Sequence, residues 1–156
     1  MISEGDPVPS FELPDSPGTL KSSKDFAGKK HVIYFYPKDF TPGCTIQADE
    51  FGSLYDEYRR RDIEVVGISP DSVESHENFR KRKNIQYVLM ADTQRKVAKM
   101  FGVWGLKKVG DKEREGVIRS SFLVGEDGII FKAYTKVKPT GHASQILDDF
   151  DGAASS

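Results

Sequence analysis

Short apolar runs alternate along this chain with longer segments of helical periodicity. Residues 31–36 and 64–69 are rich in β-branched and aromatic side chains, so they predict buried strands, and Pro37 ends the first of them. Strands that alternate with helices favour an α/β domain, in which helices cover a sheet. The 156 residues contain no linker, repeat or low-complexity tract, and we therefore expect a single domain over residues 1–156.

The helical segments follow from the spacing of apolar residues. Four of these residues share one helix face at i, i+3, i+4 and i+7: Phe51, Leu54, Tyr55 and Tyr58. This pattern predicts one long amphipathic helix after residue 43. Further helices are expected at residues 73–84, 96–101 and 144–150, and residues 151–156 read as a frayed tail.

The end of the chain adds a hairpin. Residues 121–124 and 129–131 are short apolar runs, and the turn residues between them, Glu126, Asp127 and Gly128, are typical of a tight connection. A strand–helix–strand–helix order followed by a hairpin and a helix is that of a thioredoxin-like fold, a central mixed β-sheet flanked by helices. The proline-rich segment before residue 31 is expected to form an N-terminal extension built of short turns.

Cys44 is the one cysteine of the chain, and it follows a predicted strand at the start of a predicted helix. Thr41 is a good N-cap, Pro42 suits the first helical position, and Gly43 lets another molecule approach the backbone closely. Free N–H groups and the positive end of the helix dipole stabilise a thiolate, which is the nucleophilic form of cysteine. A lone cysteine is more often a buried structural residue. The position of Cys44 at a helix start favours a reactive thiol instead.

These residues carry a family resemblance. The pattern Pro37-x-x-x-Thr41-x-x-Cys44 resembles the active-site signature of the peroxiredoxins, and the stretch from residue 36 to residue 45 resembles their PrxQ, or bacterioferritin comigratory protein, subfamily. Residues 67–72, 101–105 and 119–124 also resemble PrxQ segments, in the same order. The likeness extends from about residue 6 to residue 150.

The resemblance implies a role for each matching position. Cys44 would be the peroxidatic cysteine, which attacks a peroxide oxygen and becomes a sulfenic acid. Thr41 would align the peroxide with its hydroxyl, and Arg119 would stabilise the thiolate and the charge that develops as the O–O bond breaks. Pro37 would shield the pocket from water. Taken singly, Thr41 could be only an N-cap, Pro37 only a strand end, and Arg119 only a surface ion-pair residue.

Two further contributions follow from the same resemblance. The backbone N–H groups of Gly43 and Cys44 would point at the peroxide oxygens in the manner of an oxyanion hole. Gln47 lies one helical turn after Cys44, where many peroxiredoxins carry a glutamate that positions the arginine. We expect Gln47 to act on Arg119 and not on the peroxide.

The chain departs from the PrxQ pattern in one respect. Many PrxQ proteins carry a second, resolving cysteine five residues after the first or on the following helix near Arg80, and here Asp49 occupies the first of these positions. The resemblance then implies a catalytic cycle that needs an external thiol, such as a thioredoxin, a glutaredoxin or a small thiol, or a disulfide between the Cys44 residues of two separate chains. Two alternatives remain: a peroxide sensor that passes oxidation to a partner through a mixed disulfide, and a binding module with a vestigial thiol.

Composition excludes several other classes of function. The 23 basic and 24 acidic residues give a net charge of −1, which provides no electrostatic basis for binding nucleic acid. No run approaches the roughly 20 apolar residues of a membrane span, and residues 1–15 do not resemble a secretory signal. We expect a cytoplasmic protein without a cofactor, present as a monomer or weak homodimer.

Metal binding is not expected either. His31, His76 and His142 form no i, i+4 pair and have no carboxylate at ligand spacing in the sequence. Lys107 and Lys108 are expected to lie on a solvated face, because acidic residues are close by in the sequence.

Overall fold

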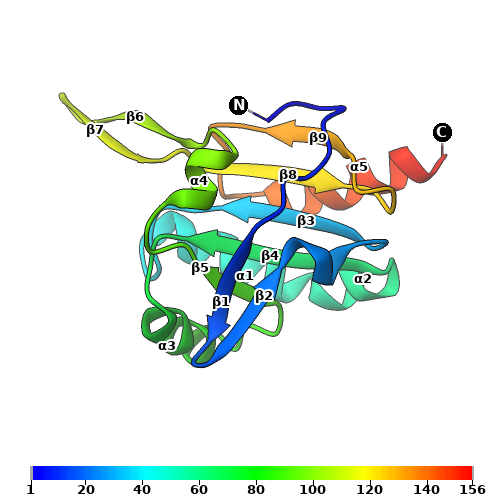
Figure 1. Ribbon diagram of the computed structural model, residues 1–156, viewed down its shortest axis with the longest axis horizontal. Helices are drawn as coiled ribbons and strands as arrows, with labels where there is room; N and C mark the ends of the chain where they lie inside the picture. Colours follow the sequence, from blue (N-terminus) through cyan, green and yellow to red (C-terminus); the bar gives the residue numbers. More distant parts are fainter. Residues whose placement is uncertain (1, 156) are drawn as a thin grey trace.

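The computed structural model describes residues 2–155, and a mixed five-stranded sheet forms its centre (Figure 1). The strand order is β5-β4-β3-β8-β9, with bounds Val88–Ala91, Ile63–Ser69, Lys30–Phe35, Ser120–Val124 and Ile130–Tyr134. The pairs β3–β4 and β4–β5 are parallel, and β3–β8 and β8–β9 are antiparallel. The expected α/β fold with a central mixed sheet is confirmed.

The alternation of side chains along β3 divides the core into two layers. Val32 and Tyr34 face one cluster of buried residues. Ile33 and Phe35 face the other. Both layers are apolar because β3 is covered on both sides, which explains its nearly continuous hydrophobic sequence.

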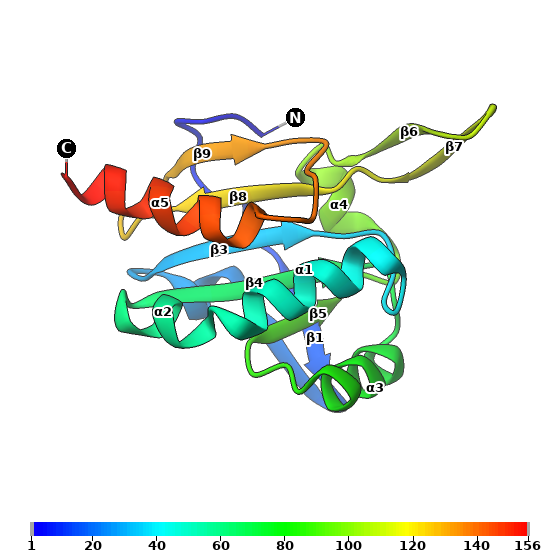
Figure 2. The same ribbon diagram turned by 180° about the vertical axis from the view of Figure 1, so that it is seen from behind.

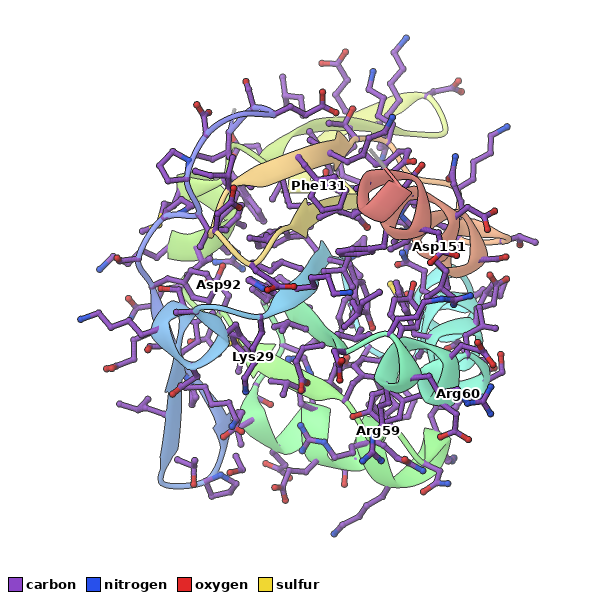
Figure 3. All side chains as sticks on the ribbon, turned by 90° about the vertical axis from the view of Figure 1, so that its right-hand side faces the viewer. Lys29, Arg59, Arg60, Asp92, Phe131 and Asp151 are labelled. Atoms are coloured by element: carbon purple, nitrogen blue, oxygen red, sulfur yellow. The ribbon has the colours of Figure 1, made fainter. Side chains whose placement is uncertain are left out.

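Helices cover the face of Val32 and Tyr34. The helices of the fold are α1 (Pro42–Ser53), α2 (Tyr55–Arg60), α3 (Val73–Lys83), α4 (Lys96–Met100) and α5 (His142–Ser155), with a short 3₁₀ helix at Ser23–Phe26. Figure 2 shows α1, α2 and α5 in front of the sheet, whereas α4 lies on its other side. Side chains fill the space between sheet and helices; Phe131 of β9, for example, lies edge-on to Phe150 of α5 at 5.1 Å between ring centroids (Figure 3).

Two antiparallel hairpins complete the fold. One is formed by β1 (Glu12–Ser16) and β2 (Thr19–Ser22), and the other by β6 (Trp104–Val109) and β7 (Lys112–Val117). The second hairpin projects beyond the edge of the sheet (Figure 1). Among residues 2–155, no helix has the length and apolar character that crossing a bilayer requires.

The prediction of one long helix after residue 43 is wrong. The segment divides into α1 and α2 at Leu54, whose N–H bonds to the carbonyls of both Glu50 and Gly52. Gly52 and Ser53 disfavour a helix interior, and the Ser53 hydroxyl donates to the Glu50 carbonyl at 3.0 Å. The apolar face was nevertheless correct, since both helices pack into the same layer of the core.

Two other expectations need correction. The N-terminal extension is not only a series of turns, because it contains the β1–β2 hairpin; Pro14 is accommodated beside a register irregularity between Pro14 and Ser16. The expected tail is helical as far as Ser155, and Ser156 lies outside the described residues. The strand β5 and the β6–β7 hairpin were not predicted.

Candidate active site

Cys44 is the third residue of α1, directly after the loop that leaves the end of β3. Its residue is only 1% exposed and its thiol is free. The first N–H groups of a helix have no acceptor within that helix. The backbone N–H groups at the start of α1 are therefore available to a negatively charged sulfur or oxygen near Cys44.

The side chain of Arg119, from a distant part of the chain, contacts Cys44. It immediately precedes β8, and its Nη2 donates to the Cys44 sulfur at 3.4 Å. Its Nη1 donates to Gln47 Oε1, one turn further along α1. The guanidinium thus bridges the thiol and a neutral amide, so its positive charge faces the sulfur without a competing carboxylate at that contact.

Gln47 is fully buried, and its Oε1 accepts the hydrogen bond from Arg119 Nη1. Its Nε2 has no hydrogen-bond partner among the residues that the structure describes. Both N–H donors of this buried amide nitrogen are therefore unpaired, which is unfavourable for stability.

Gly43 lies close to the guanidinium group of Arg119. A Cβ atom at this position would lie 2.8 Å from Arg119 Nη2 and 3.3 Å from Pro139 Cγ. Contacts this short force one of the partners to move. A larger residue at position 43 would therefore displace the guanidinium of Arg119 from the start of α1.

Thr41 occupies the N-cap position of α1, but its side chain forms no capping hydrogen bond. Its hydroxyl instead donates to the carbonyl of Lys38 at 2.8 Å. The expected capping bond is thus absent, because the loop turns the hydroxyl toward its own backbone. The first hydrogen bond of the helix, from Thr45 N to the Thr41 carbonyl, is present at 2.8 Å.

A groove of about 630 Å³ lies beside Arg119. Pro37 is half-buried and lines it together with Ile118 and Val137, which form its apolar wall. Cys44 is not among the lining residues. Arg119 lines the groove and also contacts the Cys44 sulfur.

Lys108 is exposed, as predicted, but Lys107 lies only in part on a solvated face. It is half-buried at the groove, and its ammonium group donates to the Val117 carbonyl at 2.9 Å. Burial, and then the charge of Arg119, lower the pKa of Lys107, whereas Cys44 raises it. The pairing of β6 with β7 brings this lysine to the site, and charge spacing along the sequence does not reveal that pairing.

His76 also differs from expectation. Its ring lies against the carboxylates of Asp39 and Asp71, although no carboxylate has ligand spacing in the sequence. The contact arises because α3 packs against the loop that follows β3. His76 Nδ1 is 2.7 Å from Asp39 Oδ2, and both side chains are fully buried.

Asp49 occupies the position of the missing resolving cysteine, five residues after Cys44 on α1. It is exposed and lies 3.4 Å from the ammonium group of Lys83.

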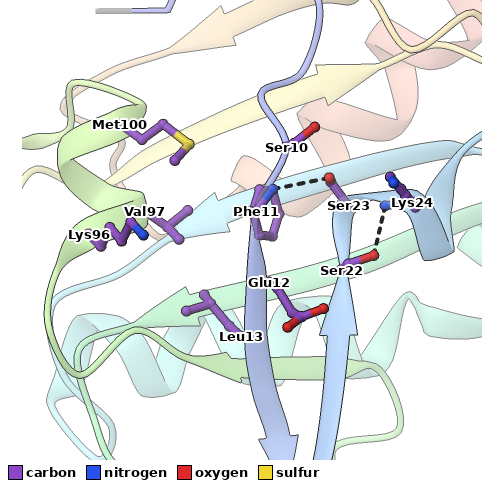
Figure 4. Close-up of a pocket in the computed structure, with 10 residues that line it drawn as sticks. All are labelled: Ser10, Phe11, Glu12, Leu13, Ser22, Ser23, Lys24, Lys96, Val97 and Met100. Atoms are coloured by element: carbon purple, nitrogen blue, oxygen red, sulfur yellow. Dashed lines mark hydrogen bonds between the residues drawn. The ribbon is translucent and has the colours of Figure 1, made fainter.

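Another hollow, of about 520 Å³, lies between the β1–β2 hairpin and α4 (Figure 4). Its lining residues Phe11, Leu13 and Val97 belong to the other layer of the core, away from Cys44.

Comparison with known proteins agrees with this geometry. The AhpC/TSA family matches residues 4–133. Peroxiredoxin Bcp of Bacillus subtilis is 39% identical over 146 residues, which cover 94% of this chain and 93% of the relative.

Solved structures show the same likeness. The crystal structure of a cysteine-to-serine variant of PrxQ from Xylella fastidiosa superimposes with a TM-score of 0.91 at 32% identity, covering 99% of this chain and 98% of that one. A structure of the Xanthomonas campestris bacterioferritin comigratory protein, described for its alkyl peroxide reduction activity, has a TM-score of 0.86 at 35% identity, covering 91% and 89% of the two chains. The chain therefore belongs to the AhpC/TSA family and, within it, to the PrxQ (bacterioferritin comigratory protein) peroxiredoxins, which are thiol-dependent peroxidases.

Proposed function

We propose that Cys44 is the peroxidatic residue of a one-cysteine cycle that reduces hydrogen peroxide and organic hydroperoxides. The Cys44 thiolate attacks the terminal oxygen of the hydroperoxide, and an S–O bond forms as the O–O bond breaks. The departing alkoxide or hydroxide takes up a proton and leaves as an alcohol or water. Cys44 is then a sulfenic acid.

The neighbouring groups stabilise charge in this step. Arg119 stabilises the thiolate first and then the negative charge on the leaving oxygen. The N–H groups of Gly43 and Cys44 and the hydroxyl of Thr41 orient the two peroxide oxygens, and Pro37 limits the access of water. The contact from Arg119 Nη2 to the Cys44 sulfur, at 3.4 Å, is the observation that carries this assignment.

An external thiol closes the cycle. It attacks the sulfenic sulfur, releases water and forms a mixed disulfide; a second thiol then releases Cys44 as a thiolate. The chain contains no other cysteine for this purpose. Because the Cys44 residue is 1% exposed, the first turn of α1 must move before a thiol can reach the sulfur. A thioredoxin, a glutaredoxin or a small thiol would each meet this requirement.

The groove supports organic hydroperoxides as substrates. Its volume of about 630 Å³ far exceeds the space that hydrogen peroxide needs, and Pro37, Ile118 and Val137 offer apolar surface to an alkyl group. The alkyl peroxide reduction ascribed to the Xanthomonas campestris relative supports the same substrate class.

Rapid-mixing kinetics test the proposal. The wild-type protein should consume one peroxide per Cys44 in a fast second-order reaction, and Cys44→Ser should abolish it. Arg119→Met should slow the reaction by about 100- to 1,000-fold, the effect of removing one donor to developing charge. A wild-type rate no faster than that of a free thiol would refute the proposal.

Turnover distinguishes the peroxidase from a redox relay. Sustained peroxide consumption with a thioredoxin, a glutaredoxin or a small thiol identifies the enzyme. Oxidation that ends after one equivalent, with a mixed disulfide to a partner protein, would identify the relay.

We also propose a cytoplasmic location and a monomer or weak homodimer. Fractionation of cells would test the location, and sedimentation analysis would test the oligomeric state.

A further inference from the structure

A buried polar network lies beneath the loop that carries the active-site residues. This loop joins β3 to α1, and Asp39 at its centre has a fully buried side chain. Its carboxylate accepts hydrogen bonds from Tyr36 Oη at 2.6 Å, Ser75 Oγ at 2.8 Å and His76 Nδ1 at 2.7 Å. Asp39 is thus tied both to the end of β3 and to α3.

His76 contacts two polar groups through its two ring nitrogens. Its Nδ1 faces Asp39 Oδ2, and its Nε2 lies 3.0 Å from the carbonyl of Met90. The ring thus connects the loop, through Asp39, to β5, through Met90. Asp39 and His76 therefore form a buried hydrogen-bonded pair that links the loop to α3.

The neighbours of this pair strengthen it. Burial, and then the charge of Asp39, raise the pKa of Tyr36 well above its usual value, so that its hydroxyl remains a donor. Asp71 accepts from the backbone N–H of Asp39 at 2.8 Å and from the hydroxyl of Ser69 at 2.6 Å. These contacts fix the loop at both its side chain and its backbone.

The same network is not arranged for a metal ion. The ligand atoms of Asp39, Asp71 and His76 lie within 4.8 Å of one another. Donor hydrogens from Tyr36, Ser75 and the backbone already point at the carboxylate oxygens, however. A cation between them would face these donors, so a hydrogen-bonded cluster is the better description.

The loop held by this network has a strained backbone. Phe40 follows Asp39 and has a φ of 67°, a left-handed conformation that a bulky residue adopts only when its surroundings impose it. Its ring is half exposed and lies edge-on to Phe79 of α3, at 5.0 Å between centroids. Thr41, the next residue, begins α1 without a side-chain capping bond. The closed loop therefore depends on contacts to α3.

We propose that the buried Asp39–His76 pair is the latch that holds the loop between β3 and α1, and with it the first turn of α1, in the closed position, and that it sets the rate at which an external thiol reaches the oxidised sulfur of Cys44. The inference rests on the proposed one-cysteine function. The closed loop presents Cys44 to peroxide, whereas reduction needs an open loop because the Cys44 residue is 1% exposed. Asp39 and His76 are positioning residues, since neither contacts the sulfur.

The latch predicts unequal effects on the two half-reactions. If the closed state is dominant, a variant that increases the open population tenfold still leaves most molecules closed. Reaction with peroxide then changes little, while reduction of the sulfenic acid accelerates in proportion to the open population. A general loss of stability would not produce this pattern.

His76→Gln is the main test, because glutamine is polar but lacks the ring whose two nitrogens contact Asp39 and Met90. We expect reduction of the sulfenic acid by a small thiol to rise about tenfold, and oxidation by hydrogen peroxide to fall by no more than about threefold. Ser75→Ala removes one of the three donors to Asp39 and should raise the reduction rate by about threefold. This second variant carries the test if His76→Gln does not fold.

Tyr58→Phe is the matched control. It removes a buried hydrogen bond, from Tyr58 Oη to the Ala143 carbonyl at 2.7 Å, that joins α2 to α5 away from the loop. Its reduction rate should equal that of the wild type. An unchanged reduction rate in His76→Gln and Ser75→Ala, or an equal rise in Tyr58→Phe, would overturn the latch.

A second readout separates this inference from the proposed function. Alkylation of reduced Cys44 by a bulky maleimide requires the open loop but no peroxide. His76→Gln should increase that alkylation rate by about tenfold as well. If Cys44 fails to react with peroxide but the alkylation rates follow this order, the proposed function fails while the latch stands. Equal alkylation rates refute the latch independently.

Discussion

Replacement of Gly43 by alanine should separate catalysis from stability. The added Cβ would lie 2.8 Å from Arg119 Nη2, well inside van der Waals contact, so the guanidinium must withdraw. Gln47 and Cys44 hold that guanidinium, and its contact to the sulfur at 3.4 Å lies at the end that must move. Withdrawal of the guanidinium lengthens this contact and weakens it.

The magnitude follows from the interaction that is lost. Loss of one donor to developing charge slows comparable reactions by about 100- to 1,000-fold, or roughly 3–4 kcal/mol. Because Arg119 remains nearby in Gly43→Ala, we expect a reduction in the peroxide rate of about 10- to 100-fold. Alanine favours a helix over glycine by about 0.5–1 kcal/mol, which offsets the contact with Pro139 at 3.3 Å. The free energy of unfolding should therefore change little.

The assay compares two measurements on the same preparations. Rapid mixing with hydrogen peroxide gives the oxidation rate, and urea unfolding gives the stability. Gly52→Ala, in the same helix, is the matched control because no atom lies within 4 Å of the added Cβ. It should raise stability by about 0.5–1 kcal/mol and leave the peroxide rate unchanged. A full peroxide rate in Gly43→Ala, or a loss explained by unfolded protein, would refute the reasoning.

Three further predictions concern charge and redox state. Arg119→Lys keeps the charge but loses the planar fork to Gln47 and Cys44, so rapid mixing should show the peroxide rate reduced by about tenfold or more, with stability within about 0.5 kcal/mol; an unchanged rate would mean that charge alone suffices. Burial lowers the pKa of His142 below the value of about 6.5 that it has when unfolded, so the unfolded state binds the proton first and stability falls as the pH drops below about 6.5; urea midpoints at several pH values should show a weaker loss in His142→Asn. Excess peroxide without thiol should convert Cys44 to the sulfinic acid, detected as a mass increase of two oxygens, and persistence of the thiol or a disulfide would contradict this.

The local part of the site could be predicted from the sequence. Thr41 and Pro42 predict a helix start because of their own backbone preferences, and Cys44 follows them within one turn. Arg119 is different, because 75 positions separate it from Cys44 in the sequence. Only the family resemblance predicted that these two residues lie close together. In the structure, Nη2 of Arg119 lies 3.4 Å from the sulfur of Cys44.

Long-range packing explains what the sequence did not reveal. Lys107 reaches the groove through the register of β6 with β7, in which it pairs with Arg114. His76 reaches Asp39 because α3 packs on the loop after β3. Both residues read as ordinary polar positions in the sequence, since neither register nor helix docking is a local property. The break at Leu54 arose from local hydrogen bonds that a hydrophobic pattern does not encode.

The burial of Cys44 has opposite consequences for the two reactants of the sulfenic acid. In the proposed mechanism peroxide is small and Arg119 activates it in the closed site, so a second peroxide would attack the sulfenic acid where the first one reacted. A thiol can reach the sulfur only after the first turn of α1 has opened, because the Cys44 residue is buried. Position 49 holds an aspartate, so the chain has no resolving cysteine there that could react first. The opening equilibrium therefore governs the partition between reduction and over-oxidation. A large closed population favours the first oxidation by peroxide and also over-oxidation, whereas a larger open population favours reduction by a thiol. In our proposal, the Asp39–His76 pair sets the ratio of these two populations.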